Sequence, residues 1–187
     1  YNQEVGWKAG FGRFTFNGAA FYQKWKDMQF GLVPLNNNAI TNIYNAGEAH
    51  IYGMESDLAY RNGGFSLVGA IAYINARLAS NFCQIDPDTQ NVVCVPGIPA
   101  AAPKGTRLPV QPRVKGNLTA RYEFPVAADN KAFVQGSMFF QDGTRSFLTD
   151  ADFAAIGSTK GFMTFDLSAG THIGDWKVEA FIENLFD

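Results

Sequence analysis

Residues able to perform catalysis are few in this chain and widely spaced. The sequence contains no Gly-x-Ser-x-Gly elbow, no His-Glu-x-x-His pair and no glycine-rich loop that could cradle a phosphate. Of its two histidines, His50 has no serine or cysteine nucleophile close to it, and His172 lies beside the short turn at Gly174-Asp175. These patterns argue against an enzyme, and we expect no catalytic residue and no cofactor.

Carboxylates that could bind a cation occur in two short patterns, Asp142-Gly143 and Asp150-Ala151-Asp152. Calcium prefers oxygen ligands of this kind, but it needs six or more of them. A lone short acidic pattern is more often part of a solvated loop. The sequence therefore predicts no metal site.

The two cysteines, Cys83 and Cys94, share the longest connecting segment, with ten residues between them. The turn-prone triplet Asp86-Pro87-Asp88 lies in that interval and could bring the two thiols together. We favour a disulfide, which persists only in an oxidising compartment. Two free thiols are the alternative, and a zinc site is less favoured because both histidines are distant in sequence.

The composition favours a β-barrel over a helical enzyme. Charged residues make up 17% and aromatic residues 14% of the chain, which also has 19 glycines, whereas soluble proteins contain roughly 25% charged residues. The formal net charge is −2, and no cluster of lysines and arginines alternates with aromatic residues, so nucleic acid is not an expected partner. No run approaches the 18 or more apolar residues of a membrane helix, but a membrane barrel needs no such run.

Alternation of apolar and polar residues predicts eight strands. In the fourth of them Phe65, Leu67, Gly69, Ile71 and Tyr73 occupy one face. The eight predicted segments are residues 4–11, 13–30, 42–61, 65–78, 108–124, 131–146, 161–173 and 176–186.

The connections between these segments alternate in length. Short ones fall near Gly12 and at residues 62–64, 127–130 and 174–175, and long ones fall at residues 31–42, 79–107 and 147–159. This alternation is typical of an antiparallel transmembrane β-barrel with short periplasmic turns and long extracellular loops. The predicted fold is thus all-β, with about eight long up-and-down strands forming a portion of such a barrel.

Electrostatic cost predicts which face meets lipid. A lysine or arginine facing lipid at the middle of the bilayer costs roughly 2–4 kcal/mol. We therefore expect Arg113, Lys115 and Arg121 to point into the lumen, and the alternate apolar residues to face lipid. Phe65 and Tyr73 lie eight residues apart, which corresponds to about 19 Å between two aromatic belts at a strand tilt near 45°.

Three stretches of the chain resemble the C-terminal part of the barrel of a TonB-dependent outer-membrane receptor. The first comprises residues 4–8, 14–22 and 26–29, and the second comprises residues 45–49 and 53–55. The third is Asn184-Leu185-Phe186-Asp187, which matches the Asn-Leu-Phe-Asp motif ending the penultimate strand in that family.

The resemblance implies a barrel of twenty-two strands around an N-terminal plug domain, in the outer membrane of a Gram-negative bacterium. Such a receptor binds a scarce nutrient, most commonly an iron–siderophore complex, and imports it with energy relayed by the TonB complex. Residues 1–187 would then be part of the barrel domain, without the plug domain and the last strand. The implied partners are the plug domain, the TonB complex acting through that plug, outer-membrane lipid and a small-molecule nutrient such as a metal chelate. A passive pore or small structural barrel, or a soluble all-β binding domain, remains an alternative.

Nine residues are candidates for ligand contact because they lie in the long loops or the upper lumen wall. Aromatic side chains and arginines suit an anionic metal chelate, through stacking and charge-assisted hydrogen bonds. Each could equally be an ordinary loop residue, and the three consecutive asparagines could serve turn formation alone. The candidates are Trp25, Gln29, Asn36, Asn37, Asn38, Tyr44, Arg107, Gln141 and Arg145.

Overall fold

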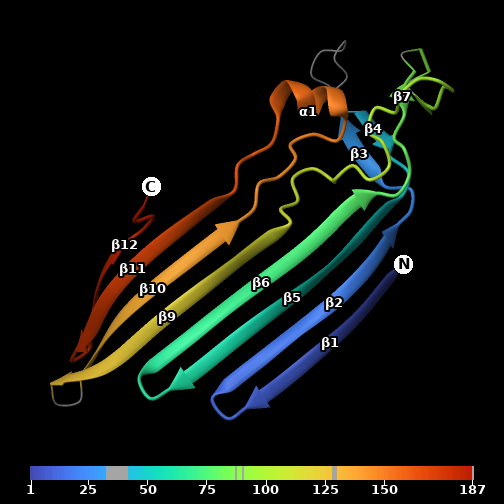
Figure 1. Ribbon diagram of the computed structural model, residues 1–187. Helices are drawn as coiled ribbons and strands as arrows, with labels where there is room; N and C mark the ends of the chain where they lie inside the picture. Colours follow the sequence, from blue (N-terminus) through green and yellow to red (C-terminus); the bar gives the residue numbers. More distant parts are fainter. Residues whose placement is uncertain (33–41, 87, 90, 128–129, 187) are drawn as a thin grey trace.

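A computed structural model describes residues 1–32, 42–86, 88–89, 91–127 and 130–186 of the chain. Eight antiparallel strands form one sheet in which every strand pairs with its neighbours in sheet order (Figure 1). These strands are β1 (Asn2–Phe11), β2 (Phe14–Trp25), β5 (Ala49–Asn62), β6 (Phe65–Leu78), β9 (Val114–Ala127), β10 (Asn130–Gln141), β11 (Phe162–Ile173) and β12 (Trp176–Ile182). Within the described residues β12 does not pair with β1, so the sheet is an open section of wall.

The short and long connections lie at opposite ends of the sheet, as the sequence predicts (Figure 1). Three short turns contain Gly12, Gly63 and Gly174, whose φ angles of 60°, 58° and 59° fit two-residue hairpins. All three long connections lie at the other end, which we call the loop end. No helix among the described residues has the length and apolar character needed to cross a membrane.

The predicted strands 13–30 and 42–61 are each wrong at the loop end. Strand β2 ends at Trp25, and Asp27 adopts a left-handed φ of 52°, which breaks the extended pattern. The chain then forms β3 (Gln29–Leu32), which pairs with β4 (Asn42–Asn45) in a separate two-stranded sheet. The alternation of apolar residues continues through the break, so it conceals the turn.

The predicted strands 108–124 and 131–146 are also too long. Strand β9 begins at Val114, because Pro109 and Pro112 cannot donate to a ladder and Val110 has a φ of 62°. Strand β10 ends at Gln141. The long connections hold three further elements absent from the prediction, namely β7 (Gln84–Ile85), β8 (Val92–Val93) and the helix α1 (Asp150–Ile156).

The two faces of the sheet differ as predicted. Directly paired residues share a face, so the register places Tyr22, Tyr52 and Tyr73 together near the loop end of the convex face. Phe14, Tyr60 and Phe65 form a second belt near the short turns, where successive ring centroids are 4.5 Å and 6.1 Å apart. Between these belts the described strands place no charged side chain on the convex face.

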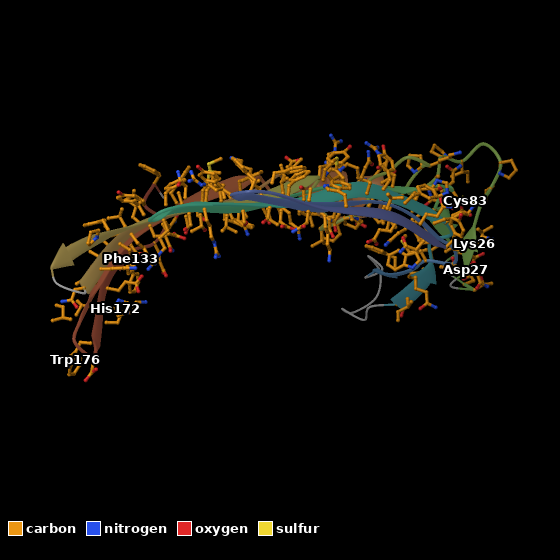
Figure 2. The ribbon with its side chains drawn as sticks, turned by 90° about the horizontal axis from the view of Figure 1, so that it is seen from below. Lys26, Asp27, Cys83, Phe133, His172 and Trp176 are labelled. Atoms are coloured by element: carbon orange, nitrogen blue, oxygen red, sulfur yellow. A yellow bond between two sulfur atoms is a disulfide. The ribbon has the colours of Figure 1, made fainter. Side chains whose placement is uncertain are left out.

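The concave face carries the charged residues of the wall. Figure 2 shows the sheet edge-on as an arc, with Phe133 and His172 on its inner side. Lys115 and Arg121 lie on this face, as expected from their register with Gln141 and Gln135. Arg113 precedes β9 and lines a separate pocket at the loop end. Its backbone carbonyl accepts from the N–H of Ile74, and its predicted lumen orientation stays a prediction.

Glycines on one strand accommodate large side chains from the next. Phe21 lies opposite Gly53, Phe140 opposite Gly116, and Phe133 opposite Gly170. In each pair a Cβ added to the glycine would come within 2.8 Å of the phenylalanine ring. Trp7 on Gly18 and Leu118 on Gly69 are pairs of the same kind. Such pairing lets a ring lie flat over the neighbouring strand.

A hydrophobic cluster under the long connections anchors them to the sheet. Its largest fully buried members are Leu78, Phe82 and Leu148, one from the end of β6 and two from loops. Met28 and Tyr44 join it from the β3–β4 region, which lies on the concave side of the sheet (Figure 2). The loop end is therefore a packed structure with its own core.

Candidate functional site

A cavity of about 590 Å³ opens beside the cluster, where β2 ends and β3 begins. The turn at Asp27 sends the chain inward, so Trp25 and Gln29 line the same cavity from two different strands. Ile74 and Gln111 complete it from β6 and from the segment before β9. Two of the predicted ligand residues are thus brought together.

The composition of this cavity suits a ligand with flat apolar surface and polar groups at its edge. Trp25 is 57% exposed, and its indole is available for stacking. The amides of Gln29 and Gln111 can each donate and accept hydrogen bonds. The cavity contains one charged carboxylate and one ammonium group, from Asp27 and Lys26. Sequence reasoning missed Gln111, since it treated residues 108–124 as one strand.

Tyr44 belongs to the hydrophobic cluster beside this cavity and does not line the cavity itself. The residue is 5% exposed and belongs to the hydrophobic cluster. Its hydroxyl oxygen accepts a hydrogen bond from Nδ2 of Asn42 at 3.2 Å. In the described structure Tyr44 therefore packs β4 against the sheet, and its role in ligand contact stays a prediction.

Arg145 organises the third long connection. Its Nε donates to the carbonyl oxygen of Phe147 at 2.7 Å, and its Nη2 donates to Asp150 Oδ1 at 2.7 Å. The guanidinium carbon lies 4.1 Å from the ring centroid of Phe153. These contacts hold the first turn of α1, where Thr149 caps the helix by accepting from the N–H of Asp152.

The remaining candidates lie in three places. Arg107 forms an isolated antiparallel bridge with Arg77 and lines a basic pocket away from Trp25. Gln141 ends β10 opposite Lys115, half-buried on the concave face. Asn36, Asn37 and Asn38 lie outside the described residues. The structure thus separates the predicted residues into a concave group and a basic group.

A second, larger concave cavity of about 840 Å³ lies at mid-height on the wall formed by β1, β2, β5, β6 and β9. Both charge signs line it, with Glu4, Lys8, Glu55, Asp57 and Lys115 among the lining residues. Asp57 Oδ2 accepts a hydrogen bond from Nδ2 of Asn17 at 2.8 Å. A polar surface of this kind can form many hydrogen bonds with a domain inside the lumen.

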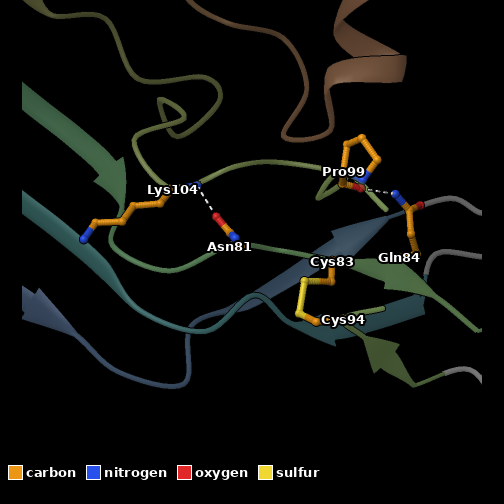
Figure 3. Close-up of a disulfide and its surroundings, with 6 residues drawn as sticks. All are labelled: Asn81, Cys83, Gln84, Cys94, Pro99 and Lys104. Carbon is orange, nitrogen blue, oxygen red and sulfur yellow. Dashed lines mark hydrogen bonds between the residues drawn. A yellow bond between two sulfur atoms is a disulfide. The ribbon is translucent and has the colours of Figure 1, made fainter. Parts of the chain in front are cut away.

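A disulfide joins Cys83 and Cys94 in the second long connection, with Cα atoms 5.0 Å apart (Figure 3). Asn81 Oδ1 accepts from the backbone N–H of Lys104 at 2.8 Å and ties the base of the loop. Backbone N–H groups of Thr89 and Asp88 hold the pKa of the Asp86 carboxyl below its usual value. The Asp86 carboxylate thus accepts hydrogen bonds from the backbone N–H groups of Asp88 and Thr89, both at 2.9 Å. Among the residues that the structure describes, no group of histidines, cysteines and carboxylates is arranged to hold a metal ion.

These features define a class of protein: the wall of an antiparallel barrel with an apolar outer face, a polar inner face and elaborated loops at one end. The sequence matches the family model "TonB dependent receptor-like, beta-barrel" over residues 1–185. The chain therefore belongs to the TonB-dependent receptor family, as its motifs indicate. Members of this family are receptors and transporters in the outer membrane of Gram-negative bacteria, not enzymes, and the convex face is thus the lipid-facing one.

Solved structures share the fold at low sequence identity. The ferric yersiniabactin uptake receptor FyuA from Yersinia pestis has a TM-score of 0.68 and 20% identity, covering 100% of this chain and 24% of its own. BauA, the ferric preacinetobactin receptor from Acinetobacter baumannii, has a TM-score of 0.63 and 17% identity, with coverages of 98% and 25%. The FrpB iron transporter from Neisseria meningitidis has a TM-score of 0.59 and 18% identity, with coverages of 99% and 26%.

The chain therefore spans about a quarter of the length of the solved structures it matches. No protein of curated function matches it in sequence.

Proposed function

We propose that this chain is part of the barrel of a receptor that captures an iron–siderophore complex and imports it with energy relayed by TonB. The observation that carries the proposal is the concave cavity at the loop end, where an exposed Trp25 and the amide of Gln29 meet. This cavity faces the lumen on the loop side, where an incoming nutrient would first meet the wall. The similar solved structures are iron and ferric-siderophore receptors by their own descriptions, which supports the same substrate class.

Residues 1–187 would form one section of the barrel domain of a longer receptor, and a plug domain would fill the lumen. The mid-height cavity supports this arrangement, because its mixed charges offer partners of both signs to a polar domain. Lys8 and Lys115 could bind carboxylates of the plug, and Glu4 and Glu55 could bind its basic groups. Coupling to the TonB complex would act through that plug.

The direct test is ligand binding by the full-length receptor purified in detergent. Ferric hydroxamate and catecholate chelates, haem and cobalamin form the panel, with tryptophan fluorescence quenching as the measurement. We expect one ferric chelate to bind, and Trp25→Ala to weaken it roughly tenfold, as for a central aromatic contact. Trp176→Ala is the matched control, since this tryptophan is 77% exposed at the opposite end of the sheet. Equal binding by both variants would remove Trp25 from the site.

Uptake in cells separates the receptor from a passive pore. Import of the labelled ferric chelate should require both this protein and TonB, and it should stop when the proton gradient is collapsed. Import that persists without TonB, together with solute flux through reconstituted vesicles, would instead indicate a pore.

A further inference from the structure

A basic pocket lies at the loop end, apart from the cavity that contains Trp25. It has a volume of about 660 Å³ and is formed by the ends of β6 and β10 with the second and third long connections. Five cationic side chains line it, against one carboxylate, that of Asp142. The cations are Arg77, Lys104, Arg107, Arg113 and Arg145.

The backbone register shows which face of the wall carries this pocket. Arg77 and Arg107 lie opposite each other in an antiparallel bridge, and the flanking hydrogen bonds make it a non-hydrogen-bonded pair. The side chains of such a pair leave the sheet close together on one face. Nε of Arg77 donates to Asn75 Oδ1 at 2.9 Å, and Nδ2 of Asn75 donates to the Tyr52 hydroxyl at 2.8 Å. The two arginines therefore lie on the convex, lipid-facing side of the wall, just beyond the aromatic belt near the loop end.

The position of the arginine pair along β6 gives its height above the bilayer core. Arg77 lies four residues beyond Tyr73, which belongs to the aromatic belt near the loop end. This separation is roughly 13 Å along the strand and about 9 Å in height at a tilt near 45°. Aromatic belts mark the boundary between hydrocarbon and headgroups. Each headgroup layer adds about 5–8 Å beyond that boundary. By these values the backbone of Arg77 lies at the outer edge of the headgroup layer of the leaflet on the loop side.

Most of the positive charge in the pocket is not neutralised by the protein. Arg145 forms an ion pair with Asp150, with 2.7 Å between Nη2 and Oδ1. In the described part of the chain no carboxylate forms an ion pair with Arg77, Lys104, Arg107 or Arg113.

Two of these arginines lie in an environment that is unfavourable for a cation. Nε of Arg113 is buried without a hydrogen-bond partner. Burial first, and then repulsion from Arg113 and Arg77, lower the pKa of Arg107, while Asp142 opposes the shift. An anion in the pocket would relieve the mutual repulsion of these guanidinium groups.

We propose that this pocket binds the phosphate group of a membrane lipid headgroup. Arginine is suited to this task, because its planar fork matches phosphate oxygens and tolerates the interface better than an ammonium group. The acyl chains would lie along the apolar convex face below the pocket, which the nutrient does not reach. This inference rests on the membrane placement of the wall and is independent of which nutrient, if any, the receptor imports.

The test measures lipid binding to the full-length receptor in neutral detergent by native mass spectrometry. Dioctanoyl phosphatidic acid is the lipid probe, dioctanoylglycerol is the same lipid without phosphate, and inorganic phosphate represents a free anion. The variant Lys104→Gln/Arg107→Gln removes two cations that hold little of the fold, since the side chain of Arg107 forms one hydrogen bond, of 3.5 Å, to Gln111. The control Arg61→Gln/Lys131→Gln removes two exposed cations near the short turns.

We expect phosphatidic acid to bind at least tenfold more tightly than inorganic phosphate, since its chains add apolar contact, and dioctanoylglycerol to bind no better than background. The pocket variant should weaken phosphatidic acid roughly tenfold or more, and the control should change it less than about twofold. Unchanged binding by the pocket variant, or equal binding of dioctanoylglycerol, would overturn the proposal. Inorganic phosphate binding as tightly as phosphatidic acid would show a site for a free anion and overturn the lipid assignment. If the pocket variant does not fold, the three-probe comparison on the wild-type receptor decides alone.

Discussion

Leu118 offers the most direct test of which face of the wall meets lipid. It lies in the middle of β9 on the convex face, opposite Gly69 of β6 and Met138 of β10. Tyr122, in the aromatic belt near the short turns, is four residues away along the same strand. Leu118→Lys therefore places an ammonium group near the centre of the hydrocarbon. Thr119→Lys is the matched control, because the next residue of a strand points to the opposite face.

The expected difference follows from the environment of each residue. A lysine facing lipid near the bilayer midplane costs about 2–4 kcal/mol. Thr119→Lys loses the 3.2 Å contact between its Oγ1 and Ser137 Oγ, a hydrogen bond of about 1 kcal/mol. The gap between the two variants is thus about 1–3 kcal/mol, or roughly 5- to 150-fold in the ratio of folded to unfolded protein.

The assay is folding of the full-length receptor into phosphatidylcholine vesicles across a urea titration, followed by its heat-modifiable migration in gels. Leu118→Lys should unfold at a lower urea concentration than Thr119→Lys, and its free energy of unfolding should be smaller by about 1–3 kcal/mol. Equal destabilisation by the two variants would refute the assignment of faces, and greater damage from Thr119→Lys would reverse it.

Two further predictions concern the loop end. Arg145→Ala should accelerate protease cleavage within the third long connection while urea unfolding of the barrel changes little, because the lost contacts all hold α1; Arg145→Lys should show an intermediate rate. Lys24, followed by His50, holds the pKa of the Glu48 carboxyl below its usual 4.5. The stabilising contribution of this carboxylate is therefore complete above about pH 4.5 and is lost as the pH falls through the lowered pKa. Hydrogen exchange at the neighbouring loop amides, corrected for intrinsic rates, should rise in that acid range in the wild type, and Glu48→Gln should remove this pH dependence; a wild-type-like rise in the variant would contradict the pairing.

The eight strands and their two faces could be predicted from the sequence because both follow from a local period of two. Their up-and-down order follows from the alternation of short and long connections. Strand ends at the loop side could not. The apolar alternation runs on past Trp25, and only the left-handed backbone at Asp27 ends β2. By contrast, Thr149 with Asp152 three residues later is a helix-start signal in the sequence, and it would have located α1.

The candidate site was predictable only in part, because local sequence patterns reveal contacts between nearby residues and not contacts between distant ones. Trp25 and Gln29 come from neighbouring positions in sequence, and a single turn brings them to one cavity. Arg107 takes its face from a bridge to Arg77, a residue 30 positions earlier in the chain. No local pattern encodes such a pairing, so its position on the lipid side could be seen only in three dimensions.

The paired glycines and rings have a consequence for how the wall is assembled. Sliding a strand by two residues keeps every apolar side chain on its own face, so the contrast between lipid and lumen cannot detect that error. Such a shift would, however, remove the contacts between the rings and the glycines opposite them. A slip between β2 and β5 would place Phe21 over Glu55 or Ile51 in place of Gly53, where a side chain already fills the space. The fit of a ring to a glycine recurs on four strand pairs of the sheet, and it selects the correct strand alignment independently of the membrane.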